Sequence, residues 1–284
     1  MALSLLLALT LLLPGALPHG CPSSSSPNPI ADRFPDKVTG TLNGTTLIVP
    51  VDLAFARRVI PAEFGILEGL YRELVPEFPA GRYPMVVTTV HDHDVGVKAL
   101  NVSMDDFSVC YFPLEFPFVD RLNNNHTPFR WAATMLLTTG SAAINGSQAY
   151  GIKVHPSTFH PPCNAYNLDS QGTTTLTAKS TSPPRSLSLS ARPDYDYVPY
   201  PFALIRNITN QPTFALSSGP CDAFARVFDT PLTGGANRPV PVRADVRAEL
   251  EPVQEGRSWF DVYGWRFSSA FVEPVLPVEC KGLA

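Results

Sequence analysis

Hydrophobic and polar positions alternate through most of this chain. Because successive strand residues point to opposite faces, such alternation is typical of half-buried β-strands. The pattern predicts strands over residues 39–51, 83–95, 107–118, 129–138, 173–192, 202–208, 223–228, 246–253 and 258–272. In the first of these, Asn43-Gly44 is a typical hairpin turn, so a β-hairpin is expected there.

A few short segments have helical character instead. Residues 53–60 follow Asp52, a typical N-cap residue, and end before Pro61, which stops a helix. Helices are also predicted over 65–75 and 141–149. The chain has 30 prolines, which argue against a helical bundle because each interrupts a helix interior. We expect a β-rich α+β domain, built as one curved antiparallel sheet or open barrel with a few short helices.

The last predicted strand, over residues 258–272, is strongly aromatic. Its aromatic side chains share one face: Trp259, Tyr263, Trp265, Phe267 and Phe271. Gly264 lies in the middle of this strand and predicts a bulge or bend.

The two ends of the chain differ in character. Residues 3–13 form an almost unbroken apolar run that is too short to span a bilayer and is typical of a signal peptide. We expect a signal peptide over 1–20, a disordered leader over 21–30 and a single domain over 31–284. No later segment is long and apolar enough to anchor the chain, so no membrane partner is expected.

Five Asn-x-Ser/Thr sequons accompany this signal-like start: Asn43, Asn101, Asn125, Asn145 and Asn207. One sequon arises often by chance, but five favour a secreted, extracellular glycoprotein. The pattern predicts that these asparagines lie on the surface.

The five cysteines are widely spaced and show no zinc-like pair. In an oxidising compartment they allow up to two disulfides and leave one thiol. We expect Cys163 to pair with Cys221, because both adjoin proline-rich loops. The formal net charge is only −4 and no basic patch is present, so no nucleic-acid partner is expected.

Lys153 is the most informative candidate for chemistry. The chain has only five lysines, and this one sits among apolar residues just after Tyr150-Gly151. An apolar pocket disfavours the charged form of a lysine, and a neutral amine condenses with a ketone. The alternative is a lysine whose stem is packed and whose ammonium lies in water.

Two further charged residues lie in apolar surroundings. Glu115 stands between two Phe-Pro-containing segments, where burial would raise its pKa; the alternative is a glutamate at a strand end that points to water. Arg130, between two aromatic residues, is a partner for Glu115 or for an anionic substrate. Its alternative is an outward-facing arginine stacked on Trp131.

Other catalytic patterns are weak or absent. His91 and His93 would point to one side of a strand, as two metal ligands require, but the sequence offers no third ligand. Solvated strand ends also carry such His-Asp runs, and we expect no metal. The chain has no Gly-x-Ser-x-Gly, His-Glu-x-x-His or phosphate-binding glycine loop. No cofactor is expected.

The order of segments resembles the acetoacetate decarboxylase family across nearly the whole mature chain. The segments that carry the resemblance are Val59-Ile60-Pro61, residues 111–117, the predicted helix over 141–149, Tyr150-Gly151-Ile152-Lys153, residues 202–205 and residues 226–232. This resemblance implies a cone-like β-barrel and a lysine that forms a Schiff base with a small β-keto acid. It implies Lys153 and Glu115 as catalytic residues and places Arg130 and Tyr150 against the substrate.

The chain departs from the family pattern around the nucleophile. The family usually has a proline directly before its reactive lysine and often a second lysine after it, whereas Ile152 and Val154 flank Lys153 here. Alignment on Tyr150 without gaps places Ile152 at the nucleophile position, and a one-residue deletion places Lys153 there. Residues 65–81 resemble an insertion.

These patterns leave three functional hypotheses. The first is a secreted decarboxylase-like lyase that acts on a small keto acid through Lys153. The second is a non-catalytic protein of the same fold that binds a keto acid or an apolar ligand. The third, suggested by the aromatic strand, is a lipocalin-like carrier, which the short helices in the first half disfavour. The sequence leaves the oligomeric state open.

Overall fold

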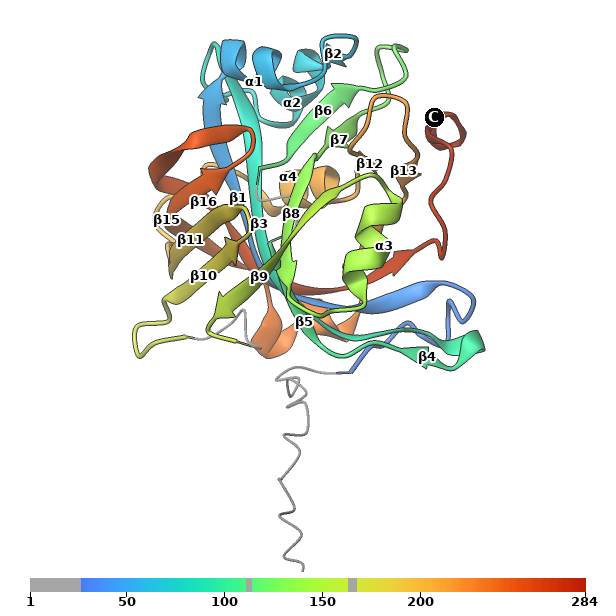
Figure 1. Ribbon diagram of the computed structural model, residues 1–284. Coiled ribbons are helices and arrows are strands. Elements are labelled where there is room, and N and C mark those ends of the chain that lie inside the picture. The colour runs from blue at the N-terminus through green and yellow to red at the C-terminus, as the bar shows by residue number, and fades with distance from the viewer. Residues whose placement is uncertain (1–26, 111–113, 163–167) are drawn as a thin grey trace, which may run out of the picture.

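The computed structural model describes residues 27–110, 114–162 and 168–284, and its β-rich fold is organised around a closed barrel of nine strands (Figure 1). Around the barrel these strands are β1 (Val38–Asp52), β16 (Val253–Glu273), β15 (Val240–Leu250), β11 (Pro184–Pro193), β10 (Thr174–Thr181), β9 (Lys153–His160), β8 (Thr134–Thr138), β5 (Phe107–Cys110) and β3 (Arg82–Val97). Pairing of β3 with β1 closes the barrel. The neighbouring strands are antiparallel except β8 and β9, which are parallel.

A smaller sheet and four short α-helices complete the part of the fold that the structure describes. The smaller sheet has the order β13 (Cys221–Asp222), β12 (Thr213–Phe214), β7 (Phe129–Trp131), β6 (Phe116–Asp120) and β2 (Gly65–Ile66). Two short strands add to the barrel, β4 (Val102–Ser103) beside β3 and β14 (Ala225–Val227) beside β16. The α-helices are α1 (Leu53–Val59), α2 (Glu68–Leu74), α3 (Ala143–Ala149) and α4 (Phe202–Thr209). Single 3₁₀ turns cover Lys98–Leu100, Pro231–Thr233, Gly235–Asn237 and Cys280–Leu283.

The expected β-rich α+β class and barrel-like architecture are therefore confirmed. The signal peptide expected over residues 1–20 lies outside the described residues. At the end of the leader expected over 21–30, Ile30 is buried against Leu232 and Ala270, so the last residues of that segment belong to the folded domain. No helix in the described ranges is long and apolar enough to cross a bilayer.

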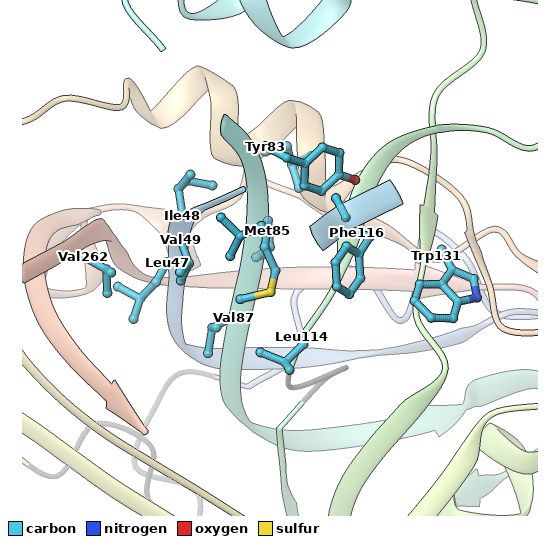
Figure 2. Close-up of a cluster of buried hydrophobic side chains, with 14 of the residues drawn as sticks. Leu47, Ile48, Val49, Tyr83, Met85, Val87, Leu114, Phe116, Trp131 and Val262 are labelled. Atoms are coloured by element: carbon cyan, nitrogen blue, oxygen red, sulfur yellow. The ribbon is translucent and has the colours of Figure 1, made fainter. Parts of the chain in front are cut away.

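The buried apolar side chains of the described residues form two larger cores, which the barrel wall separates at β8, and a small third cluster around Ile30. The interior core gathers side chains from β1 and β3, such as Leu47, Met85 and Val87, and continues toward the smaller sheet at Phe116 (Figure 2). The outer core lies where helix α3 covers β5 and β8. Alternation along β8 explains the division, because Leu136 faces the interior while Met135 and Leu137 face α3.

The hairpin expected at Asn43-Gly44 is wrong, because β1 runs through this position as one continuous strand. The side chain of Asn43 is buried and bonds to Nε2 of His93 and to the hydroxyl of Ser268, which holds it inside the sheet. A Cβ on Gly44 would lie 2.1 Å from the carbonyl oxygen of Thr89. Glycine is therefore present for close strand approach, and no turn forms.

The strand expected over 202–208 is also wrong, because helix α4 occupies this segment. Its buried residues Leu204, Ile205 and Ile208 have i, i+1 and i+4 spacing, which fits one helix face. Short apolar runs suit both structures, so tertiary packing decides between them.

Two local expectations about helix starts and bulges also change. Asp52 makes no side-chain cap on α1; its carboxylate pairs instead with Arg82, at 2.8 Å. The bulge expected at Gly264 lies elsewhere in β16. The pairing register shifts between Ala244 and Val246 of β15, and Asp261 of β16, opposite this shift, has a φ of 53°. Gly264 is needed because a Cβ there would lie 2.1 Å from the carbonyl oxygen of Thr46.

The expected pairing of Cys163 with Cys221 is wrong, because Cys221 forms a disulfide with Cys280. Cys163 lies outside the described residues. The disulfide ties the C-terminal segment to strand β13, and two backbone hydrogen bonds between Cys221 and Val278 reinforce the attachment. A disulfide of this kind is typical of an oxidising compartment.

Candidate functional site

A largely apolar cavity of about 190 Å³ lies between helix α3, the outer face of β5 and β8, and the segment that follows β16. In Figure 1, α3 lies beside β8, and the chain after β16 rises next to it toward the C-terminus. The apolar walls include Val109, Met135, Leu137, Ile152, Phe224 and Phe271. We call this space the α3 cavity.

Four side chains in the lining of the α3 cavity are polar: Ser147, Tyr150, Asp222 and Glu273. Within the described ranges, no lysine, arginine or histidine lines the space. The two carboxyl groups are half-buried, since each faces the cavity and is otherwise enclosed by protein. An apolar cavity with acidic groups in its wall and no cation is an unusual arrangement, because buried charges are normally paired.

Asp222 is positioned by the smaller sheet. In the strand register Asp222 lies opposite Thr213, which lies opposite Arg130, so these three residues form a row across β13, β12 and β7. Burial raises the pKa of the Asp222 carboxyl to about 7. The backbone N–H of Phe224, 2.8 Å from Oδ1, and the positive charge of Arg130 act in the opposite direction and favour the ionised form.

Glu273 ends strand β16 on the same face as Phe271. Burial raises the pKa of Glu273 well above its usual value, and the neighbouring Asp222 and Asp92 raise it further. A hydrogen bond from Tyr150 acts the other way. Because Glu273 and Asp222 influence one another, they titrate as a pair, with one carboxyl protonated more readily than the other.

The turn between α3 and β9 sets Tyr150 and Ile152 in the cavity wall. Gly151 follows the helix with φ of 81°, a left-handed conformation that glycine adopts without strain. The chain then enters β9 with Ile152 buried toward the cavity. Burial, reinforced by the nearby Glu273, raises the pKa of the Tyr150 phenol, which therefore stays protonated and can donate a hydrogen bond.

Lys153 lies outside this cavity, and the apolar pocket expected around it is not present. Its side chain is 59% exposed, and its Nζ pairs with Oε1 of Glu251 at 2.9 Å. Glu251 also binds Arg185 at 2.8 Å and lies 3.3 Å from Nε2 of His155. Since side chains alternate along a strand, the burial of Ile152 places the next residue on the opposite, solvated side.

Glu115 and Arg130 form a buried ion pair with 2.6 Å between the carboxylate and the guanidinium. Of the two partners considered for Arg130, the structure shows Glu115, and Glu115 is buried and does not point to water. Arg130 also donates from Nε to the carbonyl oxygen of Gln211 at 2.9 Å. Neither residue lines the α3 cavity, so Arg130 does not contact a ligand there; its charge acts on Asp222.

His91 and His93 are buried side by side on β3, with ring centroids 6.2 Å apart. His93 bonds to Asn43 and Asp94, and His91 bonds through Nδ1 to Ser108. Burial, with a contribution from His93, lowers the pKa of His91 to about 4. The described part of the chain holds no group of three or more His, Cys, Asp or Glu residues placed to bind a metal ion.

Four of the five sequon asparagines are exposed, as expected: Asn101, Asn125, Asn145 and Asn207. The expectation fails for Asn43, which is only 2% exposed and is hydrogen-bonded inside the sheet. Its environment leaves no room for a glycan in the folded protein. Asn145 lies on α3 but does not line the α3 cavity.

A second, larger hollow of about 770 Å³ lies beside Arg121 and the C-terminal segment. It is more open to solvent than the α3 cavity and includes the disulfide residue Cys280 in its wall. The guanidinium of Arg121 already rests over the rings of Phe64 and Phe214, at 4.7 and 5.1 Å from their centroids. These contacts give the arginine a structural role.

Sequence reasoning missed Asp222 and Glu273. The sequence did indicate Glu273, because it lies an even number of residues after Phe267 and Phe271 in the aromatic strand. It is therefore expected on the same, buried face as these two side chains. Asp222 carried no such signal, because only the fold brings strand β13 next to the end of β16.

No family model matches this chain, and no match is found among the curated proteins.

Proposed function

We propose that this protein binds a small, neutral and largely apolar molecule in the α3 cavity. The observation that carries the proposal is an apolar cavity whose wall holds two protonatable carboxyl groups and a tyrosine hydroxyl. Apolar walls with a few convergent polar groups are typical of small-molecule sites. The polar groups would bind one carbonyl or hydroxyl group of the ligand, and the walls would bind its hydrocarbon part.

The volume of the cavity limits the size of the ligand. An apolar cavity of about 150 Å³ accommodates benzene, and the α3 cavity measures about 190 Å³. A single six-membered ring or a short chain with one oxygen therefore fits, whereas a fused-ring compound requires the walls to move.

The charges around the cavity favour a neutral ligand over an anion. Asp222 and Glu273 carry negative charge when ionised, and no cation in the described lining offsets it. A keto acid would bring a further carboxylate into this low-dielectric space at a Coulombic cost. This favours a neutral, largely apolar ligand over a keto acid in the cavity.

Schiff-base lyase activity through Lys153 stays a prediction drawn from the family resemblance. An exposed, ion-paired lysine is not desolvated by its surroundings, so its position does not favour that activity. Incubation with acetoacetate and borohydride, followed by peptide mass spectrometry, tests it directly, with Lys153→Ala as control. A trapped adduct on Lys153 would support the lyase, and no adduct is expected.

Isothermal titration calorimetry tests the binding proposal. Cyclohexanone and cyclohexanol are expected to bind with Kd of about 1 mM or tighter, which corresponds to about −4 kcal/mol and lies within the range of small ligands. Cyclohexanecarboxylate, matched in shape but anionic, is expected to bind at least about tenfold more weakly, which is about 1.4 kcal/mol.

Two tryptophan variants on α3 locate the site. Ala143→Trp places a large side chain in the cavity wall, whereas Gln148→Trp adds the same group on the exposed side of the same helix. Binding should be lost in the first and kept in the second. Equal binding by both variants, or no binding of any neutral compound to the wild-type protein, would contradict the proposal.

A further inference from the structure

We propose that the α3 cavity removes a proton from the carbon next to a ketone carbonyl and so interconverts the keto and enol forms of its ligand. This inference rests on the proposed binding of a small neutral ligand in the same cavity. Its geometric basis is the convergence of Asp222, Glu273 and Tyr150 on one apolar space. These groups supply a base and two hydrogen-bond donors, which are the groups that enolisation requires.

Asp222 is the base, because a hydrogen bond and a nearby positive charge favour its carboxylate and oppose the burial that raises its pKa. Its Oδ1 accepts a hydrogen bond from the backbone N–H of Phe224 at 2.8 Å. The positive charge of Arg130 acts on it from two strands away, along the row across the smaller sheet. The ion pair with Glu115, at 2.6 Å, holds this guanidinium in place.

Glu273 is the acid, because its surroundings favour the protonated form. It is enclosed by protein and faces the negative charges of Asp222 and Asp92. An apolar site can keep such a carboxylic acid neutral near pH 7, so that it donates a hydrogen bond. When their environments give two neighbouring carboxyl groups different pKa values, one acts as an acid and the other as a base.

Tyr150 is the second donor. Its hydroxyl interacts with Glu273, and its only other described partner is the carbonyl oxygen of Pro274, at a long 3.5 Å. A ligand oxygen that enters the cavity can therefore compete for this hydrogen. Donors held in place before the reaction stabilise the negative charge that develops on the carbonyl oxygen.

The proton transfers balance without an oxidant or a reductant. The C–H bond next to the carbonyl breaks, its proton passes to the Asp222 carboxylate, and its electron pair forms the carbon–carbon double bond. The carbonyl oxygen takes the proton of Glu273 and becomes the enol hydroxyl. In reverse, Asp222 returns a proton to carbon, and the enol hydroxyl returns its proton to Glu273.

Exchange of ligand hydrogen for deuterium measures this reaction. Cyclohexanone is incubated with the purified protein in D₂O, and loss of the α-hydrogen signal is followed by proton NMR. We expect protein-dependent exchange at the α-carbons only. Asp222→Asn should reduce the rate by about 100-fold or more, and Tyr150→Phe by roughly 100-fold, while calorimetry shows that both variants still bind cyclohexanone.

Controls separate the cavity from other sources of exchange. Ala143→Trp should abolish protein-dependent exchange, because it occupies the cavity. Lys153→Ala should leave the rate unchanged; a loss of exchange in this variant would assign the reaction to a surface amine and overturn the inference. Full activity of Asp222→Asn would overturn it equally.

The experiment also distinguishes failure of this inference from failure of the binding proposal. If cyclohexanone binds to the wild-type protein in calorimetry but its α-hydrogens exchange no faster than in buffer, the enolisation inference is overturned and the binding proposal stands. If cyclohexanone and the other neutral compounds do not bind at all, both are overturned.

Discussion

Glu115 and Arg130 form a buried ion pair in the interior of the protein. Both side chains are nearly inaccessible, with 2.6 Å between the charged groups. Removing one partner of a buried pair leaves the other charge without compensation. The pair therefore holds β7 against the chain before β6 and keeps a positive charge near Asp222.

Arg130→Met should lower the free energy of unfolding by about 3–5 kcal/mol, because it strands the Glu115 carboxylate in the interior. Urea denaturation followed by tryptophan fluorescence measures the loss. The double variant Glu115→Met/Arg130→Met should recover much of it, since no buried charge remains. A single variant as stable as the wild type would show that the pair is not buried in solution.

Lys153→Ala should change the free energy of unfolding by less than about 1 kcal/mol, because the residue forms an exposed ion pair. Ile152→Ala, its neighbour, should cost about 2–4 kcal/mol, because it removes buried methyl groups from the cavity wall. The same urea titration compares the two variants. The reverse order of effects would place the lysine, and not the isoleucine, inside the protein.

The carboxyl pair predicts a pH dependence of stability. Both folded-state pKa values are raised, Asp222 to about 7, whereas an unfolded carboxyl titrates near about 4. Between these values the folded chain binds more protons than the unfolded chain. The stabilisation from the protonated pair is therefore fully present below about pH 4 and is lost as the pH rises through about 7.

Differential scanning calorimetry of the wild type and of Asp222→Asn/Glu273→Gln between pH 4 and 8 checks this dependence. Comparison with the double variant cancels the contributions of the histidines and other groups. The difference in Tm, wild type minus variant, should fall as the pH rises. A difference that is constant or grows would contradict the raised pKa values.

At the scale of elements, two glycines determine how closely three barrel strands pack. Cβ atoms at Gly44 and Gly264 would each lie 2.1 Å from a backbone carbonyl oxygen of the neighbouring strand. Backbone cannot retreat as a flexible side chain can, so substitution at either position forces β1 away from β3 or β16.

Gly264→Ala should therefore destabilise the protein by several kcal/mol or prevent folding. Gly69→Ala is the matched control, because Gly69 is exposed in helix α2 and a Cβ there meets no atom within 4 Å. The control should stabilise by about 0.5–1 kcal/mol, through the helix propensity of alanine. Thermal melts rank the two variants, and an equal Tm for both would refute the close approach of the strands.

The sequence predicted most of these elements, since alternation located the barrel strands other than β9 and Ser141 located helix α3 to within two residues. No predicted strand covers β9. It failed where one motif suits two structures. Asn43-Gly44 is typical of a turn, but a glycine there also suits a place where two strands approach closely. The short apolar run over residues 202–208 suits both a strand and a helix. Only contacts from distant segments, such as Ser268 on Asn43, decide between them.

The candidate site was less accessible to sequence reasoning than the fold. The sequence singled out the segment from Tyr150 to Lys153 but assigned the pocket position to Lys153, whereas Ile152 lines the cavity. A shift of one residue along a strand exchanges the buried and solvated side chains. The acidic pair joins residues from β13 and β16 that are far apart in the sequence, so no local pattern indicates it.

At the scale of the whole molecule, the Cys221–Cys280 disulfide fixes one wall of the α3 cavity. Residues 274–277 line the cavity and run from the end of β16 to this crosslink. The bridged cysteines are 59 residues apart. Loop-closure entropy for this length gives a stabilisation of about 4 kcal/mol.

Cys221→Ser/Cys280→Ser should lower the free energy of unfolding by about 2–5 kcal/mol. It should also weaken cyclohexanone binding, because the wall formed by residues 274–277 loses its attachment. Urea denaturation and calorimetry measure the two effects. Unchanged affinity in a destabilised but folded variant would show that this wall does not depend on the disulfide.

The most direct test of the account is to locate a bound ligand by crystallography. Crystals of the protein would be soaked with 4-bromocyclohexanone, and anomalous scattering would place the bromine atom. We expect the bromine peak inside the α3 cavity, with the ketone oxygen directed at Glu273 and Tyr150. A ligand bound covalently at Lys153, or found only elsewhere on the protein, would contradict the account.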